Sequence, residues 1–160
     1  MIYSRSAEYA VRAVTYLGGL APQEFAMAKF VAKETGVPAH FLAKLLQDLA
    51  REGFLKSSKG PGGGFRLAQA PEEISLLRIV ETVDGAGRYD RCPAGLAECD
   101  GKALCGIHDS WMELRSRIIG YLGGTTVAAV NQSLAEKSKR PNRGKAKGKS
   151  VKTGKKHPSR

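Results

Sequence analysis

Three cysteines and a histidine lie close together in the second half of this 160-residue chain. Cys92, Cys99 and Cys105 are separated by six and five residues, and His108 comes three positions after the last cysteine. Thiolates are soft ligands, suited to iron–sulfur clusters and zinc. Structural zinc sites usually draw on cysteine pairs separated by about two to four residues, and no such pair occurs here. Iron–sulfur clusters accept longer intervals and need a fourth ligand.

The cysteine spacing therefore favours an iron–sulfur cluster, of either the 2Fe-2S or the 4Fe-4S type. His108 is one candidate for the fourth ligand. Glu8 is the alternative, supplied by a partner subunit or brought near by folding. Zinc, or three reduced thiols without a metal, remain open as alternatives. Disulfide bonds are not expected, because the number of cysteines is odd and we expect a cytoplasmic protein.

The segment in front of the cysteines, Pro38 to Ala68, joins an amphipathic helix to a glycine-rich hairpin. Between Phe41 and Leu49, phenylalanine and leucine recur at steps of one, three and four, which predicts one buried helix face. The opposite face is polar and net positive. Gly53 is expected to end the helix. An apolar stripe alone would describe only a core helix, so the hairpin decides the interpretation.

A two-stranded ribbon is predicted because Phe54–Lys59 and Phe65–Leu67 flank the turn sequence GPGGG. These glycines permit a tight turn and close approach of a phosphate backbone, but they lack the Lys-Ser/Thr ending of a nucleotide-binding loop. A basic helix followed by a basic hairpin is typical of a winged helix–turn–helix, whose helix enters the major groove of DNA. The candidate DNA-binding residues are His40, Ala43, Lys44, Gln47, Arg51, Lys56, Lys59, Gly62, Gly63 and Arg66.

Five further helices are expected around this unit, the last of them a short terminal helix over Thr125–Leu134. Ser4 or Ser6 caps the first, where Glu8 and Arg12 form an exposed pair, and Met27–Thr35 forms the second. Ser75 caps a short helix over Leu76–Val83. A long helix then runs from about His108 to Leu122, with an apolar stripe too wide for a helix with one wet side. The stripe predicts a homodimer that presents two recognition helices about one DNA turn apart.

The chain thus divides into four parts, with a mainly α fold and a small two-stranded wing. Residues 1–84 form the winged helix–turn–helix, 85–107 the cysteine loop, 108–134 the dimerisation helix and a short terminal helix, and 135–160 a disordered basic tail. The tail carries +10 of the net charge of +11. It either adds sequence-independent phosphate contacts or acts as a solubilising extension. No apolar run approaches the roughly 20 residues of a membrane span.

From Ser4 to about Leu134, the chain resembles the Rrf-type winged-helix regulators of bacteria, which include the iron–sulfur cluster regulator, the nitric-oxide-sensing repressor and iron-responsive regulators. The resemblance rests on Ser4, Tyr9, Ala10, Arg12, Pro38, Phe41, Leu42, Lys44, Leu45, Leu46, Leu49, Ser57, Gly60, Gly63–Phe65, Leu67, Ile74–Leu77, Ile79–Glu81 and the three cysteines. The chain departs from the pattern in its first cysteine interval, which is commonly five, in Ala43, where some relatives carry an acidic residue, and in the tail.

The resemblance implies a dimeric transcription factor whose cluster state alters its affinity for double-stranded DNA. It implies that Cys92, Cys99 and Cys105 are ligands, with His108 matching one branch and Glu8 others. We therefore expect a regulator gated by a cluster that senses redox, nitric oxide or iron status. A thiol- or zinc-based regulator and a tail-driven nucleic-acid-binding protein remain as alternatives. An enzyme is not expected, because the sequence lacks a nucleophile–base pair and a cofactor loop.

Overall fold

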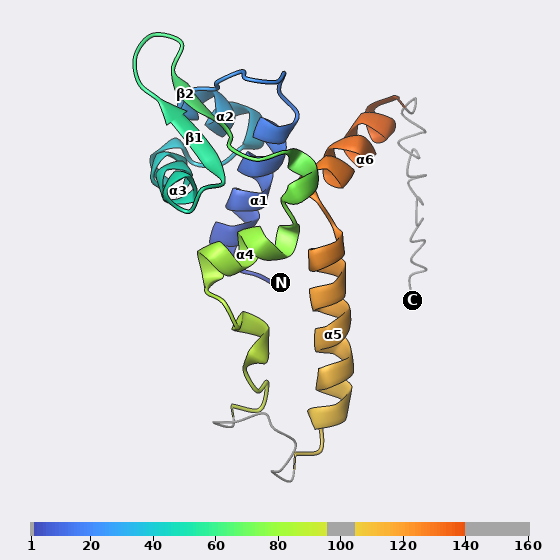
Figure 1. Ribbon diagram of the computed structural model, residues 1–160. Helices are drawn as coiled ribbons and strands as arrows, with labels where there is room; N and C mark the ends of the chain where they lie inside the picture. The colour runs from blue at the N-terminus through green and yellow to red at the C-terminus, as the bar shows by residue number, and fades with distance from the viewer. Residues whose placement is uncertain (1, 96–104, 140–160) are drawn as a thin grey trace, which may run out of the picture.

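The computed structural model describes residues 2–95 and 105–139 (Figure 1). Its helices are α1 (Arg5–Gly18), α2 (Ala28–Thr35), α3 (Ala39–Arg51), α4 (Leu76–Asp84), α5 (His108–Gly124) and α6 (Val127–Lys139). Strands β1 (Leu55–Ser58) and β2 (Gly64–Leu67) form an antiparallel pair, and η1 (Pro71–Glu73) and η2 (Arg88–Asp90) are 3-10 turns. The predicted fold class, mainly α with a two-stranded wing, is confirmed.

The core forms where α1 packs against α2, α3, α4 and α6. Small side chains on one face of α1, at Ala7, Ala10 and Ala13, are fully buried and let its neighbours approach closely. Ser4 caps α1, since its hydroxyl oxygen accepts the amide hydrogen of Ala7 at 3.1 Å. From α4, Ile79 and Val80 are also fully buried. This core supports the recognition helix from behind.

The helix–turn–helix unit consists of α2 and α3, as predicted. Gly36 ends α2 in the left-handed conformation, with φ of 69°, and Val37 and Pro38 lead into α3. The predicted buried face of α3 is confirmed by Leu42, Leu45, Leu46 and Leu49, which are all buried. Each fully buried leucine contributes about 1.5–3 kcal/mol to stability. The opposite face of α3 is therefore left to solvent or to a partner.

The hairpin of β1 and β2 pairs Lys56 with Arg66 and Ser57 with Phe65. The wing is also tied to the segment before α2, because the backbones of Ala26 and Phe65 exchange two hydrogen bonds of 2.9 Å each. Gly64 has a φ of +145°, and a β-carbon there would collide with the Ala26 carbonyl. Glycine is required at Gly64 for packing within the fold.

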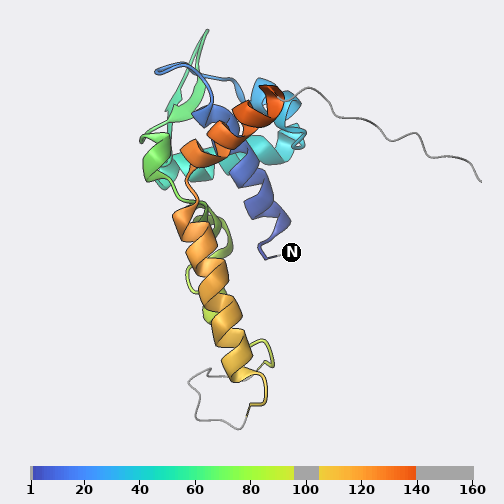
Figure 2. The same cartoon turned by 90° about the vertical axis from the view of Figure 1, so that its right-hand side faces the viewer.

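Helix α5 extends away from the winged domain in two views at right angles (Figures 1 and 2). Of its 17 residues, only Leu122 is buried. Apolar side chains on α5 remain exposed at Met112, Leu114 and Tyr121. Among the described residues, no helix combines the length and the apolar character needed to cross a membrane.

The last helix differs from the prediction. Helix α6 continues through Lys139 instead of ending at Leu134, so the first residues assigned to a disordered tail are helical. Ala135, Glu136 and Lys137 are good helix formers. Gln132 donates a 3.4 Å hydrogen bond to Glu136 one turn later, and lysines near the C-terminal end favour the helix dipole. The rest of the predicted tail, 140–160, lies outside the described residues.

Replacing Gly18 with alanine tests how α6 docks on α1. A β-carbon at Gly18 would lie 2.6 Å from Cγ1 of Val127 and 3.1 Å from Nδ2 of Asn131. We expect Gly18→Ala to lower the free energy of unfolding by about 1–2 kcal/mol in urea denaturation. Gly120→Ala is the control. Its β-carbon meets nothing within 4 Å, so it should be neutral or stabilise by up to about 1 kcal/mol. Equal effects would contradict the predicted clash.

Candidate DNA-binding surface and cysteine segment

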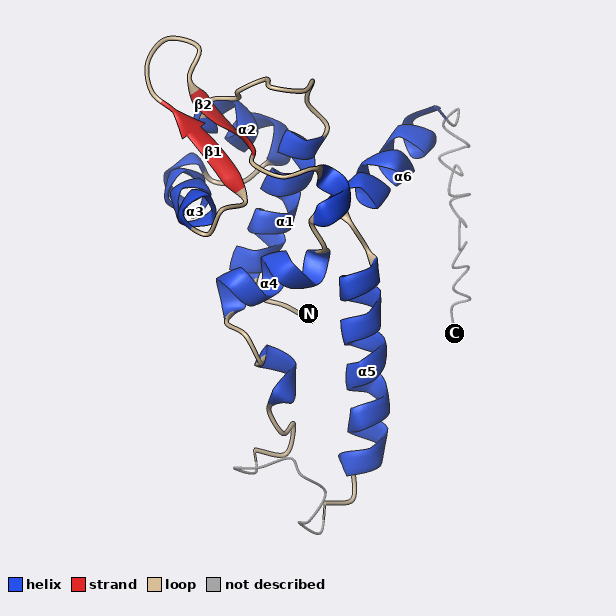
Figure 3. Ribbon diagram, in the orientation of Figure 1, coloured by secondary structure: helices blue, strands red, loops and turns tan. Residues whose placement is uncertain are grey.

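The outer face of α3 presents four of the predicted DNA-binding residues. His40, Lys44 and Gln47 are exposed on it, and Ala43 is half-buried between them. They lie opposite the buried leucines, on one helix face, because their spacing follows the period of the α-helix. Figure 3 shows α3 beside the hairpin, as a winged helix requires. This face offers hydrogen-bond donors and acceptors of the kinds that can contact base edges.

Arg51 lies at the end of the same face and is paired within α3. Its Nη1 atom lies 2.8 Å from Oδ1 of Asp48, and its side chain is 73% exposed. A solvent-exposed pair of this kind contributes at most about 1 kcal/mol. A phosphate group can therefore compete with Asp48 for the guanidinium, so the pair orients Arg51 without sequestering it.

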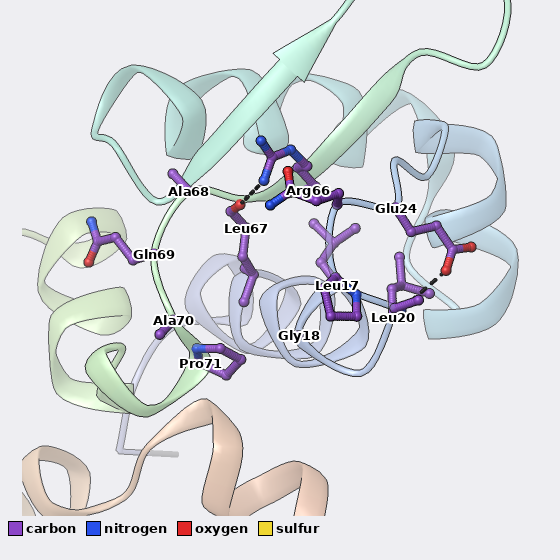
Figure 4. A pocket seen from close by; sticks show the side chains of 13 residues that line it. Leu17, Gly18, Leu20, Glu24, Arg66, Leu67, Ala68, Gln69, Ala70 and Pro71 are labelled. Carbon is purple, nitrogen blue, oxygen red and sulfur yellow. Dashed lines mark hydrogen bonds between the residues drawn. The ribbon is translucent and has the colours of Figure 1, made fainter.

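The two faces of the wing differ in chemistry. Ser57 and Phe65 face α3 across a groove that Gln47 and Arg51 also line. Lys56 and Arg66 are paired across the strands and project from the other face. Figure 4 shows Arg66 directed into a pocket beside the end of α1. Its guanidinium lies 5.2 Å from the centre of the Phe25 ring.

The structure therefore places Arg66 against the protein, whereas Lys56 and Lys59 are exposed. Arg66 shares its pocket with the carboxylate of Glu24. Of the three basic side chains predicted for the wing, the two lysines are the accessible ones. The part of Arg66 in DNA binding remains a prediction.

The glycines of the wing tip separate into two groups. Gly60 and Gly62 have φ of +91° and +76°, and a β-carbon at either position would meet nothing within 4 Å. They leave room for another molecule. Gly63 is buried and its amide donates to the Gly60 carbonyl at 3.0 Å, which closes the turn. Gly62 keeps its predicted freedom to approach a phosphate, while Gly63 acts within the hairpin.

Sequence reasoning passed over two basic residues on α2. Lys29 and Lys33 are both exposed, one turn apart, on the helix that precedes the recognition helix. In helix–turn–helix proteins, that first helix crosses the DNA backbone. The ammonium group of Lys29 also lies 5.2 Å from the centre of the exposed Phe30 ring. The sequence does carry a signal for these two residues, because two lysines stand at i and i+4 on the helix before the predicted recognition helix.

The described part of the cysteine loop consists of two arms. Cys92 follows η2, and Cys105 stands just before α5; both are half-buried. The predicted ligand Cys99 lies outside the described residues. His108 begins α5, and its amide donates to the Cys105 carbonyl at 3.3 Å. Within the described ranges, no three His, Cys, Asp or Glu side chains gather at a metal-binding spacing.

The donor set fits a soft metal centre, since two half-buried thiols and an imidazole flank the segment that carries the third thiol. Glu8 is held elsewhere, in an ion pair with Arg12 on α1, as predicted. The segment just before Glu8 contacts η2, since Ser4 binds Asp84, which pairs with Arg88. Ligation by Glu8, from the same chain or from a partner subunit, remains a prediction.

A cluster of polar contacts ties η2 to the winged domain. The Asp84 side chain is only 4% exposed and lies 3.1 Å from Nη1 of Arg88. Its carboxylate also accepts the Ser4 amide hydrogen at 2.8 Å and a hydrogen bond from the Ser4 hydroxyl. The same hydroxyl caps α1. Asp84 therefore links the start of α1, the end of α4 and the turn before Cys92.

Two further contacts hold η2 in place. The Tyr89 hydroxyl donates to the Ile2 carbonyl at 3.0 Å, and burial raises the pKa of this phenol above its usual value, so it remains a donor at neutral pH. On the other side, Asp90 pairs with Arg115 of α5. The turn before Cys92 is thereby attached to both the N-terminal segment and the long helix.

Known proteins are similar to this chain in sequence and in fold. A family model described as Rrf2, iron-dependent transcriptional regulator, matches residues 3–133. A candidate HTH-type transcriptional regulator of Aquifex aeolicus is 36% identical over 129 residues, 79% of this chain and 89% of that protein. The HTH-type transcriptional regulator IscR of Aliivibrio salmonicida is 31% identical over 114 residues, 70% of this chain and 67% of that protein.

Solved structures show the same fold. The structure of CymR, the global cysteine regulator of B. subtilis, has a TM-score of 0.68 at 21% identity and covers 81% of this chain and 95% of its own. T. potens IscR has a TM-score of 0.67 at 22% identity, over 86% and 90% of the two chains. The fold and the exposed helix define a winged helix–turn–helix DNA-binding protein. The chain belongs to the Rrf2 family of transcriptional regulators, which are not enzymes.

Removing the Asp84 carboxylate tests the contacts around η2. Asp84→Ala leaves the Ser4 amide and Arg88 without a buried acceptor, so we expect urea denaturation to show a loss of about 2–4 kcal/mol. Asp90→Ala is the matched control, because its side chain is 61% exposed in the pair with Arg115 and should cost at most about 1 kcal/mol. Similar losses for both variants would contradict the role assigned to Asp84.

Proposed function

We propose that this Rrf2-family regulator is a homodimer whose affinity for operator DNA is controlled by an iron–sulfur cluster bound at Cys92, Cys99 and Cys105. The observation that carries the proposal is the attachment of the cysteine segment to the DNA-binding domain through Asp84 and η2. A change in the segment acts on α4 and on the start of α1. The cluster would sense redox state, nitric oxide or iron status in the cytoplasm, where the DNA is.

The DNA contacts follow from exposure and charge. His40, Ala43, Lys44 and Gln47 face base edges in the major groove from α3. The phosphate contacts come from Lys44, Arg51, Lys56, Lys59 and the open backbone at Gly62, with Lys29 and Lys33 of α2 added. The basic residues beyond Lys139 supply further phosphate contacts without sequence preference.

The dimer is supported by the unpartnered apolar surface of α5. Leu114 and Tyr121 are 51% and 62% exposed, and Met112 and Ile107 add to the same helix and the residue before it. A soluble helix rarely leaves such side chains in water unless another subunit covers them. A twofold arrangement along α5 would bury them and present two copies of α3 to one duplex.

The cluster is supported by the donor set and by the family. Relatives of this chain carry the name IscR, and the family is described as iron-dependent. When bound, the cluster supplies a centre that reacts with oxidants and nitric oxide. The chain holds it through three thiolates and one further ligand, either His108 or Glu8 of the same chain or of a partner subunit. Thiolate ligands must be deprotonated to bind.

DNA binding is tested with a duplex that the full-length protein selects from a random pool. Gln47→Ala removes a base contact, so we expect discrimination between the selected duplex and a scrambled one to fall by about 1–3 kcal/mol. Lys44→Ala should weaken binding to both. Fluorescence anisotropy measures the affinities.

Removing residues 140–160 is the control for the tail. It should weaken binding to both duplexes alike and reduce the dependence of affinity on salt. A truncated protein that no longer binds either duplex would favour the tail-driven alternative. If Gln47→Ala leaves the ratio of the affinities for the selected and the scrambled duplex unchanged, base readout by that residue is contradicted.

The cluster is tested on protein prepared without oxygen, with iron and sulfide supplied. We expect a coloured protein, and we expect Cys92→Ser, Cys99→Ser and Cys105→Ser each to abolish the colour, because each removes a ligand. His108→Ala and Glu8→Ala identify the fourth ligand through a shift in the spectrum. Chelation of iron should change the affinity for the selected duplex. A colourless protein that binds the duplex equally well in all three serine variants would support a zinc or cluster-free regulator.

A further inference from the structure

The Gln69 side chain reinforces the junction between the two ends of the wing. Gln69 follows β2, and its Nε2 donates to the carbonyl of Gly53 at 3.0 Å. Gly53 lies between α3 and β1 in the left-handed conformation, with φ of +78°. The point where the chain leaves α3 is therefore tied to the point where it leaves the wing. This contact adds to the 2.9 Å backbone hydrogen bond that the Ala68 amide donates to the Phe54 carbonyl at the base of the hairpin.

Arg78 of α4 holds the same base from outside. Its Nη1 donates to Oε1 of Gln69 at 2.6 Å. The Gln69 amide therefore accepts a hydrogen bond from Arg78 through its oxygen and donates one to Gly53 through its nitrogen. The Arg78 guanidinium also lies 4.8 Å from the centre of the Phe54 ring, and Phe54 is 1% exposed. A planar guanidinium can stack on an aromatic ring and donate in its own plane at once, which a lysine cannot do.

We infer that Arg78 and Gln69 are positioning residues that set the wing relative to α3 and so determine DNA affinity without touching DNA. The inference deepens the proposed function, because it rests on the proposed contact between the wing lysines and phosphates. The chain of contacts runs from α4 through Arg78 and Gln69 to Gly53. It ends where the recognition helix turns into the wing.

We call the contacts of Arg78 and Gln69 at the base of the wing the brace. Its position explains why its loss should affect DNA binding more than folding. Arg78 is exposed, and a hydrogen bond accessible to water contributes little to stability. The second attachment of the wing, between Ala26 and Phe65, would remain. Without these side-chain contacts, the hairpin keeps its strands and the backbone hydrogen bond between Ala68 and Phe54, but α4 no longer restrains the base of the wing, so Lys59 is held less firmly relative to α3. Binding then has to restore that geometry, and affinity falls.

A double-mutant cycle with the full-length protein tests the inference. Arg78→Ala and Gln69→Ala should each weaken binding to the selected duplex by roughly 3- to 10-fold. Gln69→Ala removes no charge, so it separates the loss of the brace from a loss of positive potential. Arg78→Lys keeps the charge but not the planar stack, and should weaken binding like Arg78→Ala. Thermal unfolding of the variants should stay close to that of the parent protein.

The decisive comparison uses the variant K56A/K59A, which removes the wing lysines. If the brace acts by placing them, adding Arg78→Ala or Gln69→Ala to this variant should change affinity by less than about 2-fold. If Arg78→Ala or Gln69→Ala weakens binding as much in K56A/K59A as in the parent protein, the inference is overturned and the proposed wing contact stays intact. An unchanged affinity in K56A/K59A itself would overturn the wing contact of the proposed function, and the inference with it. If Arg78→Ala does not fold, Gln69→Ala completes the cycle.

Discussion

The packing of α4 against α1 is the contact on which the rest of the structure depends. Ile79 and Val80 are fully buried there, and α4 also packs against α5. The ends of this short helix carry polar side chains that reach in opposite directions. Arg78 reaches the base of the wing and Asp84 reaches the start of α1 and the turn before Cys92. A single rigid element therefore touches both the DNA-binding surface and the cysteine segment.

This arrangement sets a physical condition on the proposed control of DNA binding. A cluster can change DNA affinity only through a difference in free energy between two arrangements of the protein. A tenfold change requires about 1.4 kcal/mol, which is comparable to one or two hydrogen bonds in the contacts around Asp84. The core beneath α4 need not repack for a change of this size. A displacement of η2 relative to Asp84 would change contacts of this magnitude.

The local features of the fold could be predicted from the sequence, while contacts between distant residues could not. The leucines of α3, the Ser75 cap and the hairpin follow from periodicity and turn chemistry, and the structure confirms them. The sequence predicts DNA contacts for Gly63 and Arg66, which remain a prediction, but it does not show that Gly63 closes the hairpin turn or that Arg66 lies beside the Phe25 ring. The sequence shows that glycine and arginine are present but not which backbone or ring lies beside them. The contact of Ser4 with Asp84, 80 residues apart, had no sequence signal.

The choice of the fourth ligand is linked to the oligomeric state. Glu8 lies on α1 in a pair with Arg12, and the residues just before it, Ile2 and Ser4, contact Tyr89 and Asp84 ahead of Cys92. His108 belongs to the same arm as Cys105. Ligation by His108 would join the cluster to α5, whereas ligation by Glu8 would join it to α1, of the same chain or of a partner subunit. If a partner subunit supplies Glu8, loss of the cluster would also break a bond between subunits, and the spacing of the two recognition helices would respond directly.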